Sequence, residues 1–142
     1  MPDQLNDSPE DRETSHASPR AGEIWLVDFS PQVGREQSGL RPALVVSSDQ
    51  FNAVPNDLFI VCPLTTRDRG LDSHIKMGPI EGMLRQTSFV MCDQVKSQDI
   101  RRFRRRHGIA PDDVLERVLY FIRMFFSTNV SNPKDGTAAD VC

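Results

Sequence analysis

Five short runs of apolar and β-branched residues follow one another along the chain, and turn-forming residues separate them. They are residues 23–29, 42–48, 58–64, 74–77 and 87–93. Gly, Pro, Asn and Asp occupy the gaps between the runs, as the backbone of tight turns requires. Short strands at close spacing, with no helix between most of them, favour a small antiparallel barrel or a curled sheet. The predicted fold class is therefore mainly β.

One amphipathic helix is predicted after the strands, beginning at Pro111. Proline suits a first helical turn because its fixed φ and missing N–H cost nothing there. Asp112 and Asp113 complement the helix dipole. Apolar residues then recur at helical spacing, at Val114, Leu115, Val118, Leu119, Ile122, Phe125 and Phe126. We expect most of this stripe to pack on the sheet, and contact with a second copy of the chain is an open alternative for its surplus aromatic residues.

The two ends of the chain differ in composition from its middle. Residues 1–20 carry five acidic and two basic residues and almost no large apolar side chain. Such a segment buries too little surface to offset its ordering entropy, and residues 127–142 have a similar composition. We therefore predict a disordered acidic tail over residues 1–20, one folded domain over residues 21–126 and a second disordered tail over residues 127–142.

The charge of the chain is unevenly distributed. The net charge is −3 and most of it lies in the acidic tail, so the predicted domain is nearly neutral. A neutral domain is not a bulk polyanion binder, and nucleic-acid contacts must come from local clusters. The densest basic cluster comprises Arg101, Arg102, Arg104, Arg105 and Arg106. Both nucleic-acid contact and a plain solvated strand or loop remain open for it.

The cysteines indicate neither a metal site nor a disulfide framework. Cys62, Cys92 and Cys142 match no metal-ligand spacing and leave one cysteine unpaired in any disulfide scheme. Cys62 and Cys92 lie within apolar runs, so we expect buried thiols. The chain has no signal-peptide pattern and no apolar run long enough to cross a membrane. We expect a soluble, cytoplasmic protein.

Three segments together resemble the MazF/PemK family of toxins. The first is residues 22–29, followed by Pro31, Gly34, Glu36, Gln37 and residues 39–47, which read GLRPALVVS. The second is residues 61–66, VCPLTT, and the third is residues 90–97, VMCDQVKS. The helix from Pro111 completes the pattern. The resemblance spans residues 22–126, and its strength lies in the order and spacing of the segments together.

The resemblance implies both a fold and a function. The implied fold is an SH3-like curled antiparallel barrel of about five to seven strands with a C-terminal helix. The implied function is that of the toxin of a type II toxin-antitoxin system, an mRNA interferase that cleaves single-stranded RNA at a short sequence motif. The implied partners are RNA, a second copy in a homodimer, and a cognate antitoxin whose acidic, disordered tail occupies the RNA groove. No metal and no other cofactor is expected.

Metal-free RNA cleavage proceeds by attack of the 2′-hydroxyl on its own phosphate, which leaves a 2′,3′-cyclic phosphate and a 5′-hydroxyl. The reaction needs a proton acceptor, a charge stabiliser for the phosphorane and a proton donor. At the positions that match the family's motifs, Arg41 is expected to stabilise the phosphorane. Thr65 is expected to offer a hydroxyl to the same phosphate, and Asp93 to act as base or to hold the 2′-hydroxyl. Structural alternatives stay open: a surface arginine, a strand end and a turn cap.

Further residues are expected to contact RNA around these three. Single-stranded RNA is recognised through base edges, stacking and phosphates, for which amide and cationic side chains are suited. The loop of residues 30–41 is long for a strand connection, and loops of this length are commonly functional. The predicted RNA contacts are Arg35, Glu36, Gln37, Thr66, Arg67, Arg85, Gln94 and Lys96.

The chain departs from part of the family at two positions. Some members carry an arginine two residues before the aspartate and a histidine before the Glu-Gln pair, where this chain has Met91 and Arg35. Methionine cannot donate a proton, so the acid–base scheme built on that arginine does not transfer. His16, His74 and His107 match no motif position, and none is expected to be catalytic.

Two other functions remain compatible with the same sequence. Gyrase-poisoning toxins share the implied fold, and they would use exposed apolar residues at the helix end, such as Phe125 and Phe126, rather than Arg41 and Thr65. The second alternative is an inactive barrel that only binds RNA or an antitoxin.

Overall fold

The computed structural model describes residues 18–31, 33–34, 39–80 and 84–128. The predicted RNA contacts Arg35, Glu36 and Gln37 and nearly all of both predicted tails lie outside these ranges. The first described residues pack against the rest of the fold. The side chain of Pro19 is fully buried, and the Arg20 guanidinium lies 3.2 Å from the Asp49 carboxylate. The boundaries of the tails stay predictions.

Seven strands and one long helix make up the described part of the chain. The strands are β1 (Glu23–Asp28), β2 (Leu40–Val45), β3 (Leu58–Thr65), β4 (His74–Met77), β5 (Ser88–Met91), β6 (Lys96–Asp99) and β7 (Phe103–Ile109). The long helix is α4 (Asp112–Phe125), and the short helices are α3 (Asp49–Asn52), η1 (Cys92–Gln94) and η2 (Ile100–Arg102). Each of the five predicted runs overlaps a strand, although β2 begins two residues before its run and β3 ends one residue after its run. Pro111 is the N-cap of α4, and no helix in the described ranges is long and apolar enough to span a membrane.

The sequence pattern did not predict β6 or β7 as strands. The sequence of β6 is KSQD and that of β7 is FRRRHGI, so neither shows the apolar runs or the clean alternation that identify strands. Both form because they pair with strands that the core already fixes. The backbone of β6 pairs with the first half of β3, and β7 pairs with β1.

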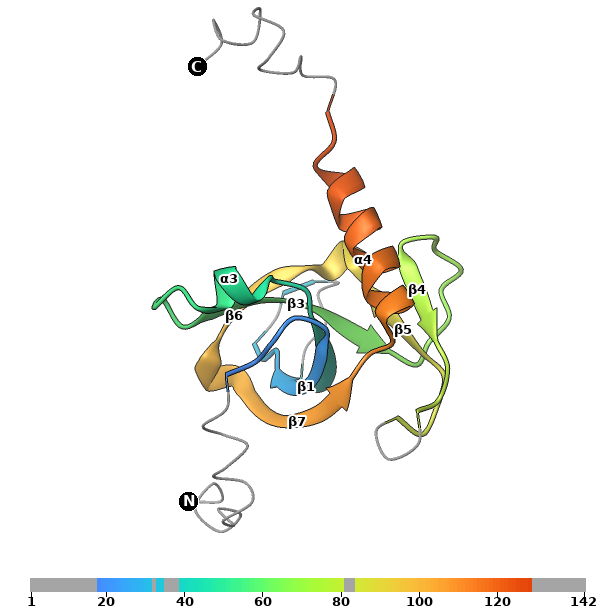
Figure 1. Cartoon of the computed structure of the whole chain (residues 1–142). Helices are drawn as coiled ribbons and strands as arrows, with labels where there is room; N and C mark the ends of the chain where they lie inside the picture. The colour runs from blue at the N-terminus through green and yellow to red at the C-terminus, as the bar shows by residue number, and fades with distance from the viewer. Residues whose placement is uncertain (1–17, 32, 35–38, 81–83, 129–142) are drawn as a thin grey trace, which may run out of the picture.

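The strands form one curled antiparallel sheet in the order β4-β5-β3-β2-β1-β7, and β6 pairs with β3 off this path. The long strand β3 pairs with β6 near its start and with β5 at its end, so the sheet changes partners along it and bends. Figure 1 shows β1 and β7 curving beneath the molecule while α4 lies beside β4 and β5. The predicted mainly β fold with a C-terminal helix is confirmed.

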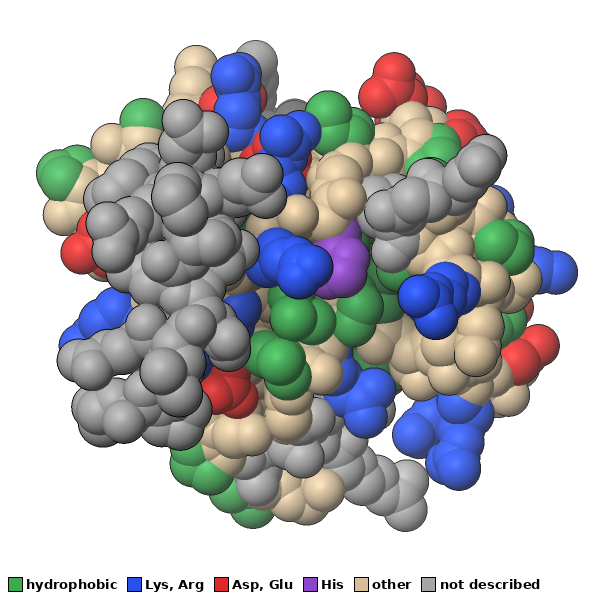
Figure 2. Space-filling view, turned by 90° about the horizontal axis from the view of Figure 1, so that it is seen from below, with side chains coloured by type: hydrophobic (Ala, Val, Ile, Leu, Met, Phe, Trp, Pro, Cys, Tyr) green, Lys and Arg blue, Asp and Glu red, His purple; other side chains and the backbone are tan. Residues whose placement is uncertain are grey.

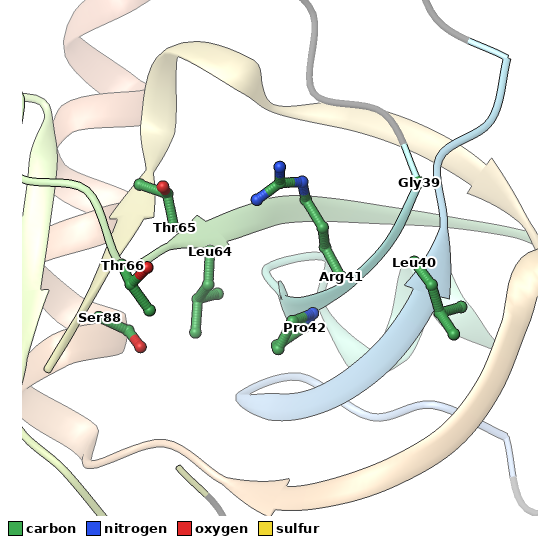
Figure 3. Close-up of a pocket in the computed structure, with 8 residues that line it drawn as sticks. All are labelled: Gly39, Leu40, Arg41, Pro42, Leu64, Thr65, Thr66 and Ser88. Carbon is green, nitrogen blue, oxygen red and sulfur yellow. The ribbon is translucent and has the colours of Figure 1, made fainter. Parts of the chain in front are cut away.

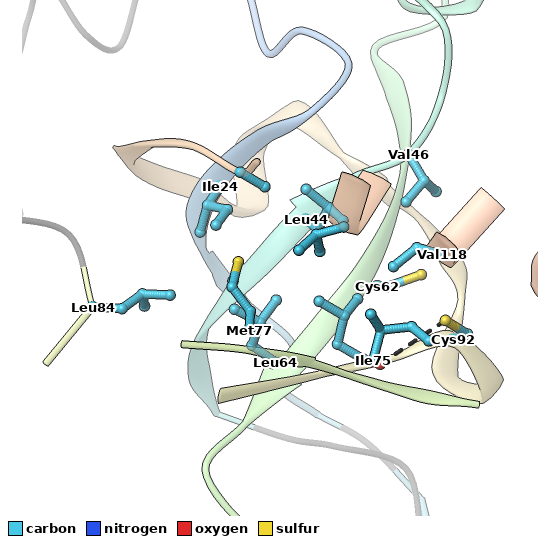
Figure 4. Close-up of a cluster of buried hydrophobic side chains, with 13 residues drawn as sticks. Ile24, Leu44, Val46, Cys62, Leu64, Ile75, Met77, Leu84, Cys92 and Val118 are labelled. Carbon is cyan, nitrogen blue, oxygen red and sulfur yellow. Dashed lines mark hydrogen bonds between the residues drawn. The ribbon is translucent and has the colours of Figure 1, made fainter. Parts of the chain in front are cut away.

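Alternation along the strands divides the core into two clusters, one on each face of the sheet. One cluster lies between the sheet and α4 and includes Ile24, Leu44, Leu64, Ile75, Val90, Val114 and Val118 (Figure 4). The other lies inside the curl and consists of Trp25, Val27, Phe29, Ala43, Val45, Phe59, Val61 and Phe103. There the rings of Trp25 and Phe59 meet Phe103 edge-on at centroid distances of 5.9 and 5.4 Å, a favourable arrangement of aromatic quadrupoles.

The predicted buried thiols are confirmed. Cys62 and Cys92 are both free and fully buried in the cluster beneath α4. Burial raises the pKa of Cys62 well above its ordinary value, and burial, with the nearby Asp93 carboxylate, raises the pKa of Cys92 to about 12. Both thiols are therefore neutral packing groups at physiological pH.

Candidate functional site

The pairing of β2 with β3 determines where Arg41 and Thr65 lie. Ala43 is opposite Pro63 and Leu44 is opposite Cys62 in this antiparallel pair. Two residues further on, Arg41 near the start of β2 is level with Thr65 at the end of β3. An even number of residues keeps both on the face of Ala43 and Pro63. Figure 3 shows the two side chains projecting from the same side of the sheet, with the guanidinium extending toward β3.

A pocket lies at this point, where β2 begins and β3 ends. Its cavity volume is about 330 Å³, within the size range of small-ligand sites. The pocket is lined by Gly39, Leu40, Arg41, Pro42, Leu64, Thr65, Thr66 and Ser88 (Figure 3). Two strand ends and the first residue of β5 thus surround one cation and several hydroxyl groups.

Local structure holds both key side chains in place. Arg41 precedes Pro42, which restricts the residue before it to extended backbone. Thr65 is 8% exposed, and its Oγ1 accepts a hydrogen bond from the Arg67 N–H at 3.1 Å. That bond uses an acceptor lone pair, so the hydroxyl proton can still be donated to a ligand. In the sequence, Arg41 directly precedes one predicted strand and Thr65 directly follows another, and these positions at strand ends were the signal.

Asp93 does not join this pair. Phe89 of β5 is opposite Thr65, whereas Asp93 lies beyond the end of β5, in η1, and is not among the residues that line the pocket. The Asp93 carboxylate instead lies 2.9 Å from Nε2 of His74, whose side chain is 3% exposed. Nδ1 of His74 is buried and has no partner among the described residues. Within the described residues, the Asp93 side chain therefore pairs with His74 and does not line the pocket.

The other predicted RNA contacts fall into two groups. Thr66 lines the pocket and Arg67 follows it in the exposed turn after β3. Gln94 ends η1 and Lys96 begins β6, where it pairs with Val61, so both lie near Asp93 rather than near Thr65. Arg85 is exposed shortly before β5. The described residues of the predicted site thus lie partly around the pocket and partly in η1 and β6, rather than at one point.

The sequence did not predict five of the eight residues that line the pocket. These are Gly39, Leu40, Pro42, Leu64 and Ser88, of which Leu40, Pro42 and Leu64 adjoin a predicted residue. Ser88 comes from a different strand, and its hydroxyl donates to the Gln86 carbonyl at 3.2 Å. Only the pairing of β5 with β3 brings it beside the pocket, and no sequence signal gives that register.

The arginine cluster is held largely by the protein itself. Its partners are Asp99 for Arg101, the backbone carbonyls of Asp28 and Ser30 for Arg102, Asp28 for Arg104, and Glu23 for Arg106 at 2.7 Å. Hydrogen bonds from Arg101 lower the pKa of Asp99. On the β7 side of the molecule, Lys and Arg side chains are separated by apolar and other groups (Figure 2). The solvated-strand alternative is the one this geometry favours.

In the described part of the chain, potential metal-ligating residues do not cluster. Within the ranges that the structure describes, no three His, Cys, Asp or Glu side chains gather closely enough to hold an ion. The pair of His74 and Asp93 supplies two such groups, fewer than the three protein ligands typical of a catalytic zinc site.

Comparison with known proteins relates this chain to one protein family. Residues 20–126 match the family model of the PemK-like, MazF-like toxins of type II toxin-antitoxin systems. The chain belongs to this family. The family predicted from the sequence is therefore confirmed, and the match covers every strand and α4.

Individual relatives within the toxin family agree. The chain is 35% identical over 100 residues to Endoribonuclease PemK of Escherichia coli, which covers 69% of this chain and 74% of that protein. It superposes on the crystal structure of MazF from Deinococcus radiodurans with a TM-score of 0.70 and 33% identity, covering 79% of this chain and 99% of the other. A MazE-MazF structure from the same organism gives a TM-score of 0.63 at 33% identity, with coverages of 78% and 96%.

Proposed function

We propose that this toxin is a metal-independent endoribonuclease that cleaves single-stranded RNA at a short motif, with Arg41 and Thr65 acting together on the scissile phosphate. Membership of the toxin family and the identity to Endoribonuclease PemK support RNA cleavage as the activity. The observation that carries the chemistry is the placement of Arg41 and Thr65 at one level on one face, in one pocket.

The proposed reaction begins when the 2′-hydroxyl gives its proton to a water molecule and its oxygen bonds to the phosphorus. The phosphorane carries extra negative charge, which the Arg41 guanidinium stabilises because it can direct two N–H donors at phosphate oxygens. The Thr65 hydroxyl donates a further hydrogen bond to the same group. The bond to the 5′-oxygen then breaks and that oxygen takes a proton, which leaves a 2′,3′-cyclic phosphate and a 5′-hydroxyl end.

Asp93 takes a different role in this scheme. Its position in η1, outside the pocket, and its bond to His74 are unsuited to proton transfer at the Arg41–Thr65 phosphate. We assign Asp93 to contacts with flanking nucleotides, together with Gln94 and Lys96. An exposed carboxylate beside an amide and an ammonium can bind exocyclic amino groups and phosphates of unpaired RNA.

We further propose that the toxin forms a homodimer, binds a cognate antitoxin whose acidic, disordered tail occupies the RNA groove, and acts in the cytoplasm. The solved MazE-MazF structures of relatives support an antitoxin partner. The second half of α4 extends past the sheet (Figure 1), where Tyr120, Met124, Phe125 and Phe126 are between 45 and 75% exposed. Exposed apolar area of this kind marks a contact surface.

The test is to incubate the purified protein with long RNA of mixed sequence in excess chelator and to map the new ends. The proposal predicts discrete cuts with 5′-hydroxyl termini. Cleavage that stops in chelator and returns with a divalent cation would contradict metal independence. Intact RNA together with trapped gyrase–DNA complexes would instead favour the gyrase-poisoning alternative, for which the exposed Phe125 and Phe126 are the supporting observation.

A further inference from the structure

We propose that Lys76 on β4 binds an RNA phosphate next to the scissile one and so extends the RNA path from the Arg41–Thr65 pocket across the sheet. Lys76 belongs to none of the segments that carry the family resemblance, and no role follows for it from them. The inference rests on the proposed function, since it names a binding residue for the same substrate.

A single cross-strand row joins Lys76 to the pocket. Lys76 is the partner of Phe89, and Phe89 is the partner of Thr65. Thr65 is in turn level with Arg41. Residues that oppose one another across antiparallel strands point to the same face, so the row places two cations on one face with an aromatic ring and a hydroxyl between them.

The surroundings of Lys76 direct its ammonium outward. The neighbouring Ile75 and Met77 are 1 and 2% exposed and pack beneath α4, so alternation turns Lys76 to the opposite face, where it is exposed. Lys76 forms no salt bridge with any residue in the described ranges. Arg101, Arg104 and Arg106, by contrast, each lie against a carboxylate. The Lys76 ammonium can therefore be neutralised by a bound phosphate.

The spacing indicates which phosphate Lys76 would reach. Lys76 and Arg41 are three strands apart, which corresponds to roughly 14 Å between backbones at the usual separation of about 4.8 Å. That span exceeds a single phosphate group, so the two cations contact different nucleotides. Phe89, between them in the row, is only 9% exposed and contributes no competing charge. The ammonium is a flexible point charge, suited to phosphate and not to base recognition.

The position of Lys76 outside the pocket predicts an effect on binding rather than on chemistry. Loss of a phosphate contact removes one released counterion, so the slope of log Kobs against log salt should fall by about 0.7 for a single strand. Lys76→Ala should weaken RNA binding several-fold and raise KM by a similar factor, while the single-turnover rate at saturating RNA stays near that of the wild type. Lys76→Arg should restore both.

The experiment measures fluorescence anisotropy of a short single-stranded RNA carrying 2′-O-methyl groups, which block cleavage, over a range of salt. Arg117→Ala is the matched control, because it removes one charge from the exposed side of α4, on the far face of the sheet. We expect Lys76→Ala, but not Arg117→Ala, to lower the RNA affinity and to reduce the slope of log Kobs against log salt. Thermal melts check that both variants are folded.

Three outcomes overturn the inference, and they can be distinguished. If the wild type cleaves RNA and Lys76→Ala matches Arg117→Ala in affinity and salt slope, Lys76 does not bind phosphate, although the proposed function stands. If the wild type neither binds nor cleaves single-stranded RNA, the proposed function fails and the inference with it. A fall in the single-turnover rate of Lys76→Ala without a change in affinity would also contradict a binding role.

Discussion

At the residue scale, the same side-chain type has different roles according to what surrounds it. Arg106 lies 2.7 Å from the nearly buried Glu23, which also accepts from the backbone N–H of Arg20 and from the Trp25 indole. Arg106 thereby contributes to holding β7 against β1. Arg41, in contrast, stands in a pocket lined mainly by backbone, hydroxyls and apolar groups. Composition alone does not separate structural arginines from functional ones.

The buried thiols give a pH-dependent prediction at this scale. Their pKa values are raised in the folded protein, so the folded state keeps protons that an unfolded chain would release near pH 9. The stability linked to this is fully present below about pH 9 and is lost as the pH rises toward 12. We expect the urea midpoint to fall with rising pH above 9, and to fall less steeply in Cys92→Ala. Equal slopes for the two proteins would contradict the argument.

Alkylation offers an independent check of the same thiols. Iodoacetamide at pH 8 should leave the peptides containing Cys62 and Cys92 unmodified in the native protein and modify both in guanidinium, because only a thiolate that is accessible reacts. Peptide mass spectrometry reads the result directly. Rapid labelling of either peptide under native conditions would show that the region beneath α4 opens readily.

At the element scale, the strands and the helix that could be predicted were those whose apolar residues form a continuous run or recur at helical spacing. The apolar run of residues 58–64 and the helical stripe from Val114 to Phe126 predicted β3 and α4 directly. The polar strands β6 and β7 carry no such pattern, because their stability comes from pairing with β3 and β1 rather than from burial of their own side chains. Tertiary pairing of this kind cannot be seen in a single sequence.

The packing of α4 on the sheet can be tested by one truncation. Val118 is fully buried in the cluster beneath the helix, so Val118→Ala should lower the free energy of unfolding by about 2 kcal/mol through lost burial and the cavity it leaves. Urea titration measures the loss. Arg117→Ala, one residue away on the exposed side, should change stability by less than about 0.5 kcal/mol. Similar losses in both variants would mean that α4 does not pack as described.

At the scale of the whole molecule, the sequence predicted the pair that forms the pocket but not its full shape. Arg41 and Thr65 were found because each ends a recognisable strand, and the strand register then brings them together. Asp93 was grouped with them, yet its separation from Thr65 depends on how β5 runs past β3 and on a bond to His74 that is distant in the sequence. Ser88 and Lys76 were missed for the same reason.

The extent of the folded unit is a prediction at this scale. A shortened chain of residues 18–128 keeps Pro19 and the whole of α4, so it should melt within a few degrees of the full-length protein and cleave RNA. Differential scanning calorimetry and an RNA cleavage assay measure the two properties. A loss of about 10 °C or more in Tm would show that the terminal segments contribute to the fold, against the predicted domain boundaries.

The most direct test of the account is a double-mutant cycle on Arg41 and Thr65, measured as single-turnover cleavage of one defined RNA at saturating protein in chelator. Arg41→Ala should reduce the rate by about 100-fold or more, and Thr65→Val should reduce it as well. Because both side chains act on one phosphate, the double variant should lose much less than the product of the single losses. Losses that multiply, or wild-type cleavage by Arg41→Ala, would show that the two residues do not share a scissile phosphate.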